Sequence, residues 1–246
     1  ELQKLAEGTN SYSVSVTDAY GQTQTINGEF SLDTTTDSVA ISIIAGDDYL
    51  NLAESGSDMI VRGNSAGLPE GAVIVIMLNG KAYTALVGAS GAWETTVDSA
   101  DLGLLSDGIN TITASTTTVN GTVSDSHNFT VLIHTLPQAQ VNPPFVDGIV
   151  NQVESTQNQV LTGSTSVTGP GQAVVVTLNG QQYIGTVDSN GNWSVTLPSG
   201  ALSALPSGPA TVSVEVKDVA GNSSTIPVNF TAVSYTHLTL PTICSV

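Results

Sequence analysis

The sequence predicts an all-β protein built from tandem β-sandwich modules arranged end to end. The first observation is an internal repeat, in which Leu78-Asn79-Gly80 returns as Leu178-Asn179-Gly180 at a spacing of 100 residues. The second is a series of short strand-like runs with turn residues between them, spaced by roughly ten residues. The third is the absence of any long stretch with helical periodicity. Together they indicate a module of about one hundred residues.

The repeat divides the chain into four parts. Residues 1–33 are expected to be the C-terminal part of a truncated module, because Gly8 and Gly21 match Gly108 and Gly121. Residues 34–132 and 133–232 are expected to be two full modules. Residues 233–246 depart from the pattern and resemble translated sequencing-adapter read-through, a short genuine linker being the alternative.

Each full module is centred on a predicted hairpin. Asn-Gly between two apolar runs favours a two-residue type I′ turn, because that turn needs a positive φ at both central residues. The strands flanking Asn79-Gly80 and Asn179-Gly180 should therefore pair. A second glycine turn then leads into a strand that carries Trp93 or Trp193. The tryptophans could stack on sugars, but a core position between two sheets is the favoured interpretation.

Composition excludes several classes of function. Four basic residues stand against 21 acidic ones, which gives a net charge of −17 and disfavours nucleic acid and anionic lipid as partners. Cys244 is the only cysteine, so no disulfide framework is expected. The sequence has no Ser-His-Asp spacing, phosphate-binding loop or His/Cys cluster, and we expect no catalytic residues and no enzyme activity.

An acidic loop near the start of each module supplies candidate metal ligands. Carboxylate and amide oxygens are the ligands that Ca²⁺ prefers. A solvated polar loop that only keeps the surface soluble is the alternative. Strand alternation places the loop of the first module near Asp218 and Asn222 of the second, so a cation there would join both modules. The loop candidates are Asp47, Asp48, Asn51 and Glu54 in the first module and Asp147, Asn151 and Glu154 in the second.

Three motifs carry a resemblance to a known family across residues 1–232. They are the run from Ile44 to Glu54, the Leu-Asn-Gly hairpin with its following Gly-x-Trp, and the run from Val216 to Asn222. The chain resembles the bacterial Ig-like tandem repeats of large secreted biofilm-associated and RTX-type adhesins. The resemblance implies Ig-like sandwiches, a cell-surface or extracellular stalk exported by type I secretion, and structural Ca²⁺ with Asp33 as a linker ligand.

The sequence departs from this family pattern at three places. Thr118 stands where Asp18 and Asp218 stand, Leu132 stands in the place of Asp33, and Gly148 replaces the second acid of the loop. We therefore expect calcium at some junctions and not at others.

The expected function is a structural stalk segment that supports adhesion or biofilm formation. Its expected partners are neighbouring modules, Ca²⁺, and a host or biofilm receptor bound by other parts of the parent protein. A glycan- or protein-binding Ig-like module and an accessory domain of an extracellular enzyme remain as alternatives.

Overall fold

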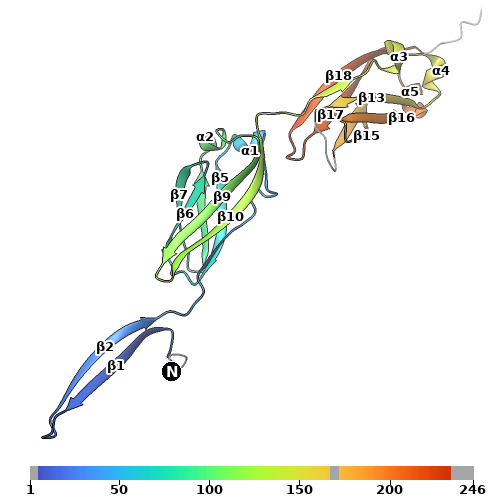
Figure 1. Ribbon diagram of the computed structural model, residues 1–246. Coiled ribbons are helices and arrows are strands. Elements are labelled where there is room, and N and C mark those ends of the chain that lie inside the picture. The colour runs from blue at the N-terminus through green and yellow to red at the C-terminus, as the bar shows by residue number, and fades with distance from the viewer. Residues whose placement is uncertain (1–4, 167–171, 234–246) are drawn as a thin grey trace, which may run out of the picture.

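A computed structural model describes residues 5–166 and 172–233, and the expectation for the last residues of the chain lies almost wholly outside this range. The chain forms a row of three bodies, a two-stranded hairpin followed by two β-sandwiches (Figure 1). All helices of the described part have only four or five residues. The all-β prediction and the arrangement of Ig-like sandwich modules end to end are confirmed.

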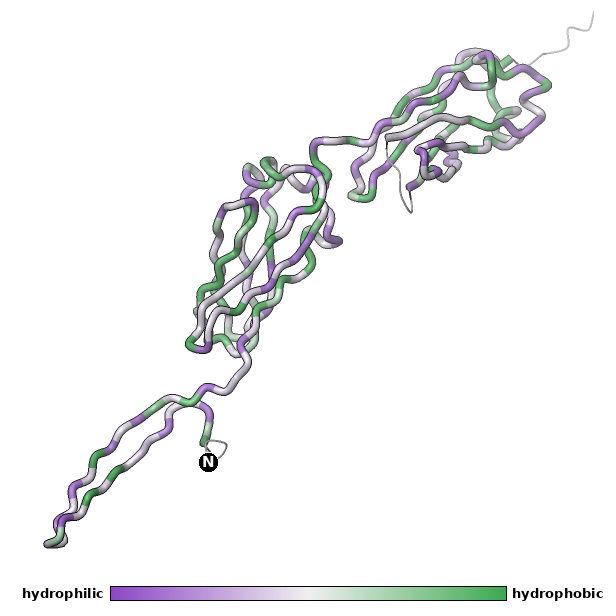
Figure 2. Tube along the Cα trace, in the orientation of Figure 1, coloured by the Kyte–Doolittle hydropathy of each residue, from purple (hydrophilic) through white to green (hydrophobic). Residues whose placement is uncertain are grey.

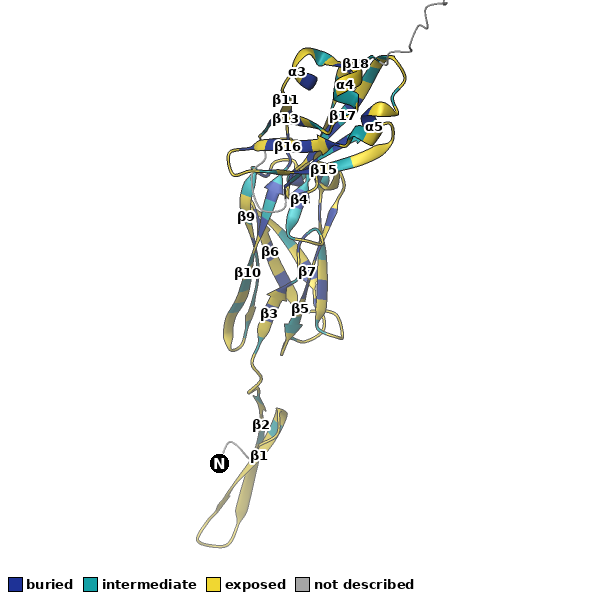
Figure 3. Cartoon of the chain, turned by 90° about the vertical axis from the view of Figure 1, so that its right-hand side faces the viewer, coloured by how far each residue is buried: buried dark blue, intermediate teal, exposed yellow. Residues whose placement is uncertain are grey.

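The N-terminal hairpin consists of β1 (Gly8–Thr17) and β2 (Thr23–Leu32), paired from Gly8↔Leu32 to Thr17↔Thr23. Its apolar side chains, Val14 and Ile26 among them, are exposed on a ribbon that no other described strand covers (Figure 3). Two strands alone are marginally stable in water. That this hairpin is part of a larger module stays a prediction.

The first sandwich contains two sheets. The larger sheet has the order β4-β10-β9-β6-β7 and the smaller one the order β3-β5-β8. Its strands are β3 (Ser38–Ile41), β4 (Tyr49–Asn51), β5 (Met59–Ala66), β6 (Val73–Leu78), β7 (Lys81–Leu86), β8 (Ala92–Val97), β9 (Gly108–Thr118) and β10 (Gly121–Leu132), with the short helices α1 (Leu52–Ser55) and α2 (Ser99–Leu102).

Hydrophobic residues are frequent along the strands of this sandwich (Figure 2), and alternation of buried and exposed side chains builds its core. On β6, Ile74, Ile76 and Leu78 point inward, while the residues between them are exposed. The Trp93 indole packs across Gly63 on the neighbouring strand. A Cβ atom at Gly63 would lie 2.1 Å from both the Trp93 ring and the Ala40 carbonyl oxygen. The glycine is therefore what allows the tryptophan to enter the core.

The second sandwich repeats this order of strands in one continuous sheet. Its order is β11-β13-β16-β15-β14-β17-β18-β12. The strands are β11 (Ala139–Val141), β12 (Ile149–Val150), β13 (Gln159–Thr165), β14 (Ala173–Leu178), β15 (Gln181–Val187), β16 (Asn192–Leu197), β17 (Gly208–Lys217) and β18 (Ser223–Ala232), with helices α3 (Phe145–Gly148), α4 (Gln152–Ser155) and α5 (Ser199–Ser203).

The two sheet patterns diverge beside a position that is glycine in one sandwich and alanine in the other. In the second sandwich β15 pairs with β16, and a Cβ atom at Gly185 would lie 2.1 Å from the Ser194 carbonyl oxygen. The first sandwich has the buried Ala85 at this position, and β7 and β8 do not form the same ladder. We expect the methyl group of Ala85 to be the reason. The Thr95 hydroxyl instead donates to the Thr84 carbonyl at 3.0 Å.

The two sandwiches have separate hydrophobic cores. One core runs from Val39 to Ile133 and the other from Ala139 to Ala232. Both predicted hairpin turns are confirmed, since φ is positive at all four central residues, Asn79, Gly80, Asn179 and Gly180. Each sandwich thus has its own core. The contacts between the bodies are therefore the place to look for how the modules are held relative to one another.

Candidate functional site

The linker between the two sandwiches is held by one carboxylate. Asp107 precedes β9, and its Oδ1 accepts hydrogen bonds from the amides of Ile133 at 2.8 Å and His134 at 3.0 Å. Its Oδ2 accepts from the amide of Thr135 at 2.7 Å. Burial raises the pKa of Asp107, but the hydrogen bonds from these three residues outweigh burial and lower the pKa well below its usual range. We call Asp107 the linker clamp.

The same device occurs at the first joint. Glu7 lies 100 residues before Asp107, and both of its carboxylate oxygens accept from the amide of Thr34, at 3.0 and 3.1 Å. The Thr34 hydroxyl also donates to Glu7. An acid directly before a strand-opening glycine therefore holds the departing linker at both joints. Neither Glu7 nor Asp107 was predicted from the sequence, although the 100-residue spacing between these two acids was a usable signal.

Residues 218–222 form the turn between β17 and β18, and hydrogen bonds within the turn make it compact. We call it the docking turn. The carboxylate of Asp218 accepts from the amides of Ala220 at 3.0 Å and Asn222 at 2.9 Å through Oδ1. Its Oδ2 accepts from Nδ2 of Asn222 at 2.8 Å. Both residues are buried, with Asp218 only 9% and Asn222 only 8% exposed to solvent. Both oxygens of Asp218 thus have partners within its own turn.

Asn222 joins the docking turn to the first sandwich. Its Oδ1 accepts from the Leu52 amide at 2.9 Å, and its Nδ2 donates to the Leu132 carbonyl at 2.7 Å. In the opposite direction, Nδ2 of Asn51 donates to the Ala220 carbonyl at 3.0 Å. The acidic loop and the docking turn therefore meet across the junction, and the contact consists of direct hydrogen bonds.

Three copies of this turn give an internal comparison. Ala220, whose turn rests on a neighbouring sandwich, is 5% exposed, whereas Tyr20 of the hairpin turn is 90% exposed. The preceding position differs in the same direction, since Val119 in the turn between β9 and β10 is 89% exposed and its counterpart Val219 in the docking turn is 45% exposed. Burial of the turn thus accompanies contact with the end of another sandwich.

The acidic loop of the first sandwich uses its predicted ligands for local structure. Asn51 caps α1 by accepting from the Glu54 amide, and Glu54 accepts from the Asn51 amide in return. Asp47 accepts from the Tyr49 amide at 3.0 Å. Burial raises the pKa of Asp48, but the Ile44 amide at 2.8 Å and Nε2 of His127 at 2.7 Å outweigh this and lower the pKa. These four residues line one loop without converging on a common point.

The loop of the second sandwich has the same construction. Asn151 and Glu154 form a capping box around α4, and Asp147 accepts from the Ile149 amide at 2.9 Å. Across the described residues, no group of three or more His, Cys, Asp or Glu side chains could hold a metal ion. Ca²⁺ takes six to eight oxygen ligands, so backbone carbonyls, amide oxygens or water would have to supply most of the ligands at these loops.

At the first joint, two carboxylates share one side-chain amide group. Nδ2 of Asn120 lies 3.4 Å from Oδ2 of Asp33 and 3.5 Å from Oδ2 of Asp37. Hydrogen bonds from the hydroxyl and amide of Thr35 lower the pKa of Asp33. Both aspartates line a shallow pocket of about 480 Å³, together with backbone of the Gly67–Pro69 loop. Asp37 was not among the predicted ligands.

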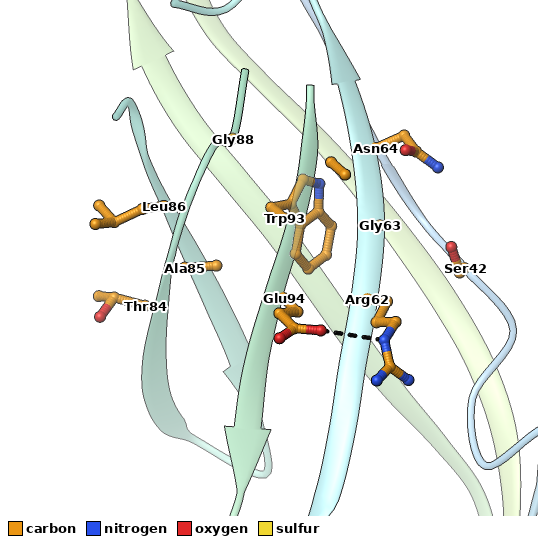
Figure 4. Close-up of a pocket in the computed structure, with 11 residues that line it drawn as sticks. Ser42, Arg62, Gly63, Asn64, Thr84, Ala85, Leu86, Gly88, Trp93 and Glu94 are labelled. Carbon is orange, nitrogen blue, oxygen red and sulfur yellow. Dashed lines mark hydrogen bonds and ion pairs between the residues drawn. The ribbon is translucent and has the colours of Figure 1, made fainter. Parts of the chain in front are cut away.

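A groove lies beside Trp93 in the first sandwich. It has a volume of about 740 Å³, and the Arg62–Glu94 ion pair and Thr84 lie on its walls (Figure 4). The two tryptophans are each only 3% exposed, so their faces are not available for stacking on a sugar. The Trp193 indole N–H donates to the Ser164 carbonyl at 3.2 Å. Both indoles are core residues, in agreement with the favoured interpretation.

A protein-family model matches most of the second sandwich. Residues 147–232 match the family model of the bacterial Ig-like domain. No curated protein matches the chain. Among the described residues, no helix is long and apolar enough to cross a membrane.

Solved structures of bacterial adhesins are similar to the chain. A 1.5-MDa bacterial ice-binding adhesin matches with 25% identity and a TM-score of 0.46, over 94% of this chain and 75% of that one. A Ca²⁺-stabilised adhesin from an Antarctic bacterium that binds ice has 27% identity and a TM-score of 0.47, over 92% and 57%. An Ig-like domain of the M. primoryensis ice-binding adhesin has 28% identity and a TM-score of 0.32, over 41% and 99%.

Proposed function

We propose, from the premise that residues 147–232 are a bacterial Ig-like domain, that this chain is a spacer segment of an extracellular bacterial adhesin. Its role is to hold other parts of the parent protein at a distance from the cell surface. The parent protein would leave the cell by type I secretion and support adhesion or biofilm formation. The spacer works through fixed joints between modules.

One observation carries this proposal, namely the Asn222 side chain that bonds to both Leu52 and Leu132 across the junction. A freely jointed pair of domains would expose these groups to water. Here both polar atoms of the Asn222 side-chain amide and both oxygens of its partner Asp218 have hydrogen-bond partners. Together with the linker clamp, the bridge limits bending between the sandwiches. Limited bending is the property that a spacer needs.

Calcium is the second part of the proposal, and we assign it to the first joint. Asp33 and Asp37 bring two carboxylates to one amide group of Asn120, and the chain has few cations to offset them, with a net charge of −17. Neighbouring backbone carbonyls and water would have to complete the ligand set. At the second joint, the side-chain amides of Asn51 and Asn222 already donate to the Ala220 and Leu132 carbonyls, so the contact there is made by direct hydrogen bonds.

Small-angle scattering of the full chain tests both parts. We expect Asn222→Ala combined with Asp107→Ala to shorten the mean end-to-end length and broaden its distribution, with or without calcium. Val219→Ala, at a half-exposed site of the same turn, is the matched control and should leave the length unchanged. A double variant with the same length distribution as the unmodified chain contradicts the spacer mechanism.

Calcium binding has its own readout. Extracellular calcium modules bind with dissociation constants of about 10⁻⁴ to 10⁻³ M, so roughly millimolar calcium should stabilise the folded joint by about 1 kcal/mol. We expect calcium, and not magnesium, to extend the chain at the first joint, and Asp33→Asn with Asp37→Asn to abolish the effect. Asp47→Asn with Glu54→Gln is the comparison that tests the acidic loop. An equal response to both metals or to neither excludes a structural calcium site.

A further inference from the structure

The far end of the second sandwich repeats the surface on which the docking turn rests. In the first sandwich this docking surface consists of Asn51, Leu52 and Leu132. Parallel pairing of β12 with β18 matches that of β4 with β10, so Val150↔Ala232 corresponds to Leu50↔Val131. The counterparts of the docking surface are therefore Asn151, Gln152 and Val233. They lie at the end that faces away from the first sandwich (Figure 1).

The local backbone of the two docking surfaces is the same. Asn51 has φ −96° and ψ 172°, and Asn151 has φ −82° and ψ 173°, each within a complete capping box. Val233 is held against β12 by its amide, which donates to the Val150 carbonyl at 2.8 Å. The second surface therefore presents its polar groups in the arrangement that binds Asn222 in the first.

Among the residues that the structure describes, nothing occupies the second docking surface, whereas the docking turn occupies the first. Asn51 is half-buried by the docking turn, whereas Asn151 is exposed. Within the described part of the chain, Nδ2 of Asn151 has no hydrogen-bond partner, although Nδ2 of Asn51 donates to Ala220. Around it stand Val146 and Val153, which are 94% and 68% exposed. Such exposed apolar side chains next to free polar groups are typical of a contact surface.

We infer that Asn151, Gln152 and Val233 bind the docking turn of another copy of this module, through the same three hydrogen bonds that Asn222 and Asn51 make at the observed junction. This inference rests on the proposed spacer function. The two ends of the module are unlike, so the contact is head to tail and does not close on itself. Each added copy leaves a new docking surface at its far end, and the array can grow by repetition of one joint.

A chain with one added module tests the inference. A second copy of residues 133–233 is inserted directly after Val233, so that the copy follows Val233 as Ile133 follows Leu132. Separate cores show that each sandwich supports itself, so the insertion should fold. Amide hydrogen exchange then compares the Gln152 amide with the Leu52 amide, which the existing junction protects. We expect exchange at Gln152 to slow on the order of tenfold or more relative to the unextended chain.

Variants separate the two junctions. Asn222→Ala in the added copy should restore fast exchange at Gln152 and leave Leu52 unchanged, while the same substitution in the original copy should do the reverse. Gln152→Pro provides a variant that leaves the docking turn intact, because proline is tolerated at the first helical position and removes the N–H that the turn would bind. It should shift the side-chain amide signal of Asn222 in the added copy.

Each outcome has a distinct meaning. A protected Leu52 beside an unprotected Gln152 overturns the inference and leaves the spacer function standing. Loss of protection at both amides overturns both. Protection of Gln152 that persists with Asn222→Ala in the added copy, together with no shift for Gln152→Pro, also overturns the inference, since another contact would then cover this surface.

Discussion

Replacing Asp107 by alanine should release the linker between the sandwiches while leaving both cores folded. Asp107 is the sole acceptor found for the amides of Ile133, His134 and Thr135 among the described residues, at 2.7 to 3.0 Å. A hydrogen bond to a charged group contributes about 1.5–3 kcal/mol. Water can replace part of this at a side chain that is 20% exposed, so the three bonds together should contribute about 2 kcal/mol rather than three full values.

A loss of about 2 kcal/mol multiplies the population of the released linker roughly thirtyfold, since 1.4 kcal/mol corresponds to a factor of ten. Amide exchange at Ile133 and Thr135 should accelerate by that factor. The thermal midpoints of the sandwiches should hardly move, because Asp107 lies outside the strands. Glu94→Ala, which removes an exposed ion pair from the same sandwich, is the control and should leave linker exchange unchanged. Unaltered exchange in Asp107→Ala would refute the clamp.

The pH dependence follows from the lowered pKa of Asp107. A carboxyl group whose pKa is lower in the folded state stabilises that state fully above its unfolded value of about 3.8. The contribution is lost as the pH falls from there through the folded-state pKa. Between pH 5 and 7 the clamp should therefore be insensitive to pH. Below about pH 4 the difference in linker exchange between the unmodified chain and Asp107→Asn should shrink.

Three further predictions concern the sandwiches and the hairpin. Gly63→Ala should lower the free energy of unfolding of the first sandwich by about 1–3 kcal/mol, because the added Cβ would lie 2.1 Å from the backbone oxygen of Ala40. Denaturant melts measure this loss, and a midpoint equal to that of the unmodified chain would contradict the prediction. Gly185→Ala should break the β15–β16 ladder, and the Ser194 amide should then exchange faster with solvent. If exchange of the Ser194 amide stays slow, the methyl group is not what separates the sheets. Amides of β1 and β2 should exchange rapidly in the monomer, since no core covers them, and strong protection there would exclude an isolated hairpin.

Turn chemistry explains why the architecture was predictable from sequence. Asn79-Gly80 and its copy determine their own backbone, because few other residue pairs adopt positive φ twice in succession. The 100-residue repeat then carried each local prediction into the second module. The fold class, the hairpins and the buried tryptophans therefore required no knowledge of contacts between distant residues.

The contacts at the junction were harder to predict from the sequence, because the same residues suit two roles. Asn51 and Glu54 have the spacing of a capping box and also the oxygen atoms of a cation site, and sequence alone does not choose between them. Asn222 was noted as a ligand, yet its role as a bridge depends on the Leu132 carbonyl, a group that every residue carries. The effect of Ala85 is visible in the sequence only after the distance at Gly185 is known.

The pairing of β10 has a mechanical consequence. Because the linker continues directly from β10, tension between the ends of the first sandwich pulls this strand along its own axis. Its antiparallel ladder with β9 runs from Gly121↔Thr118 to Val131↔Gly108, and its last residues also pair with β4 in parallel. Load along the axis stretches all of these hydrogen bonds at once in shear, whereas load across it would peel them open singly. A module pulled in this direction resists force with its whole ladder.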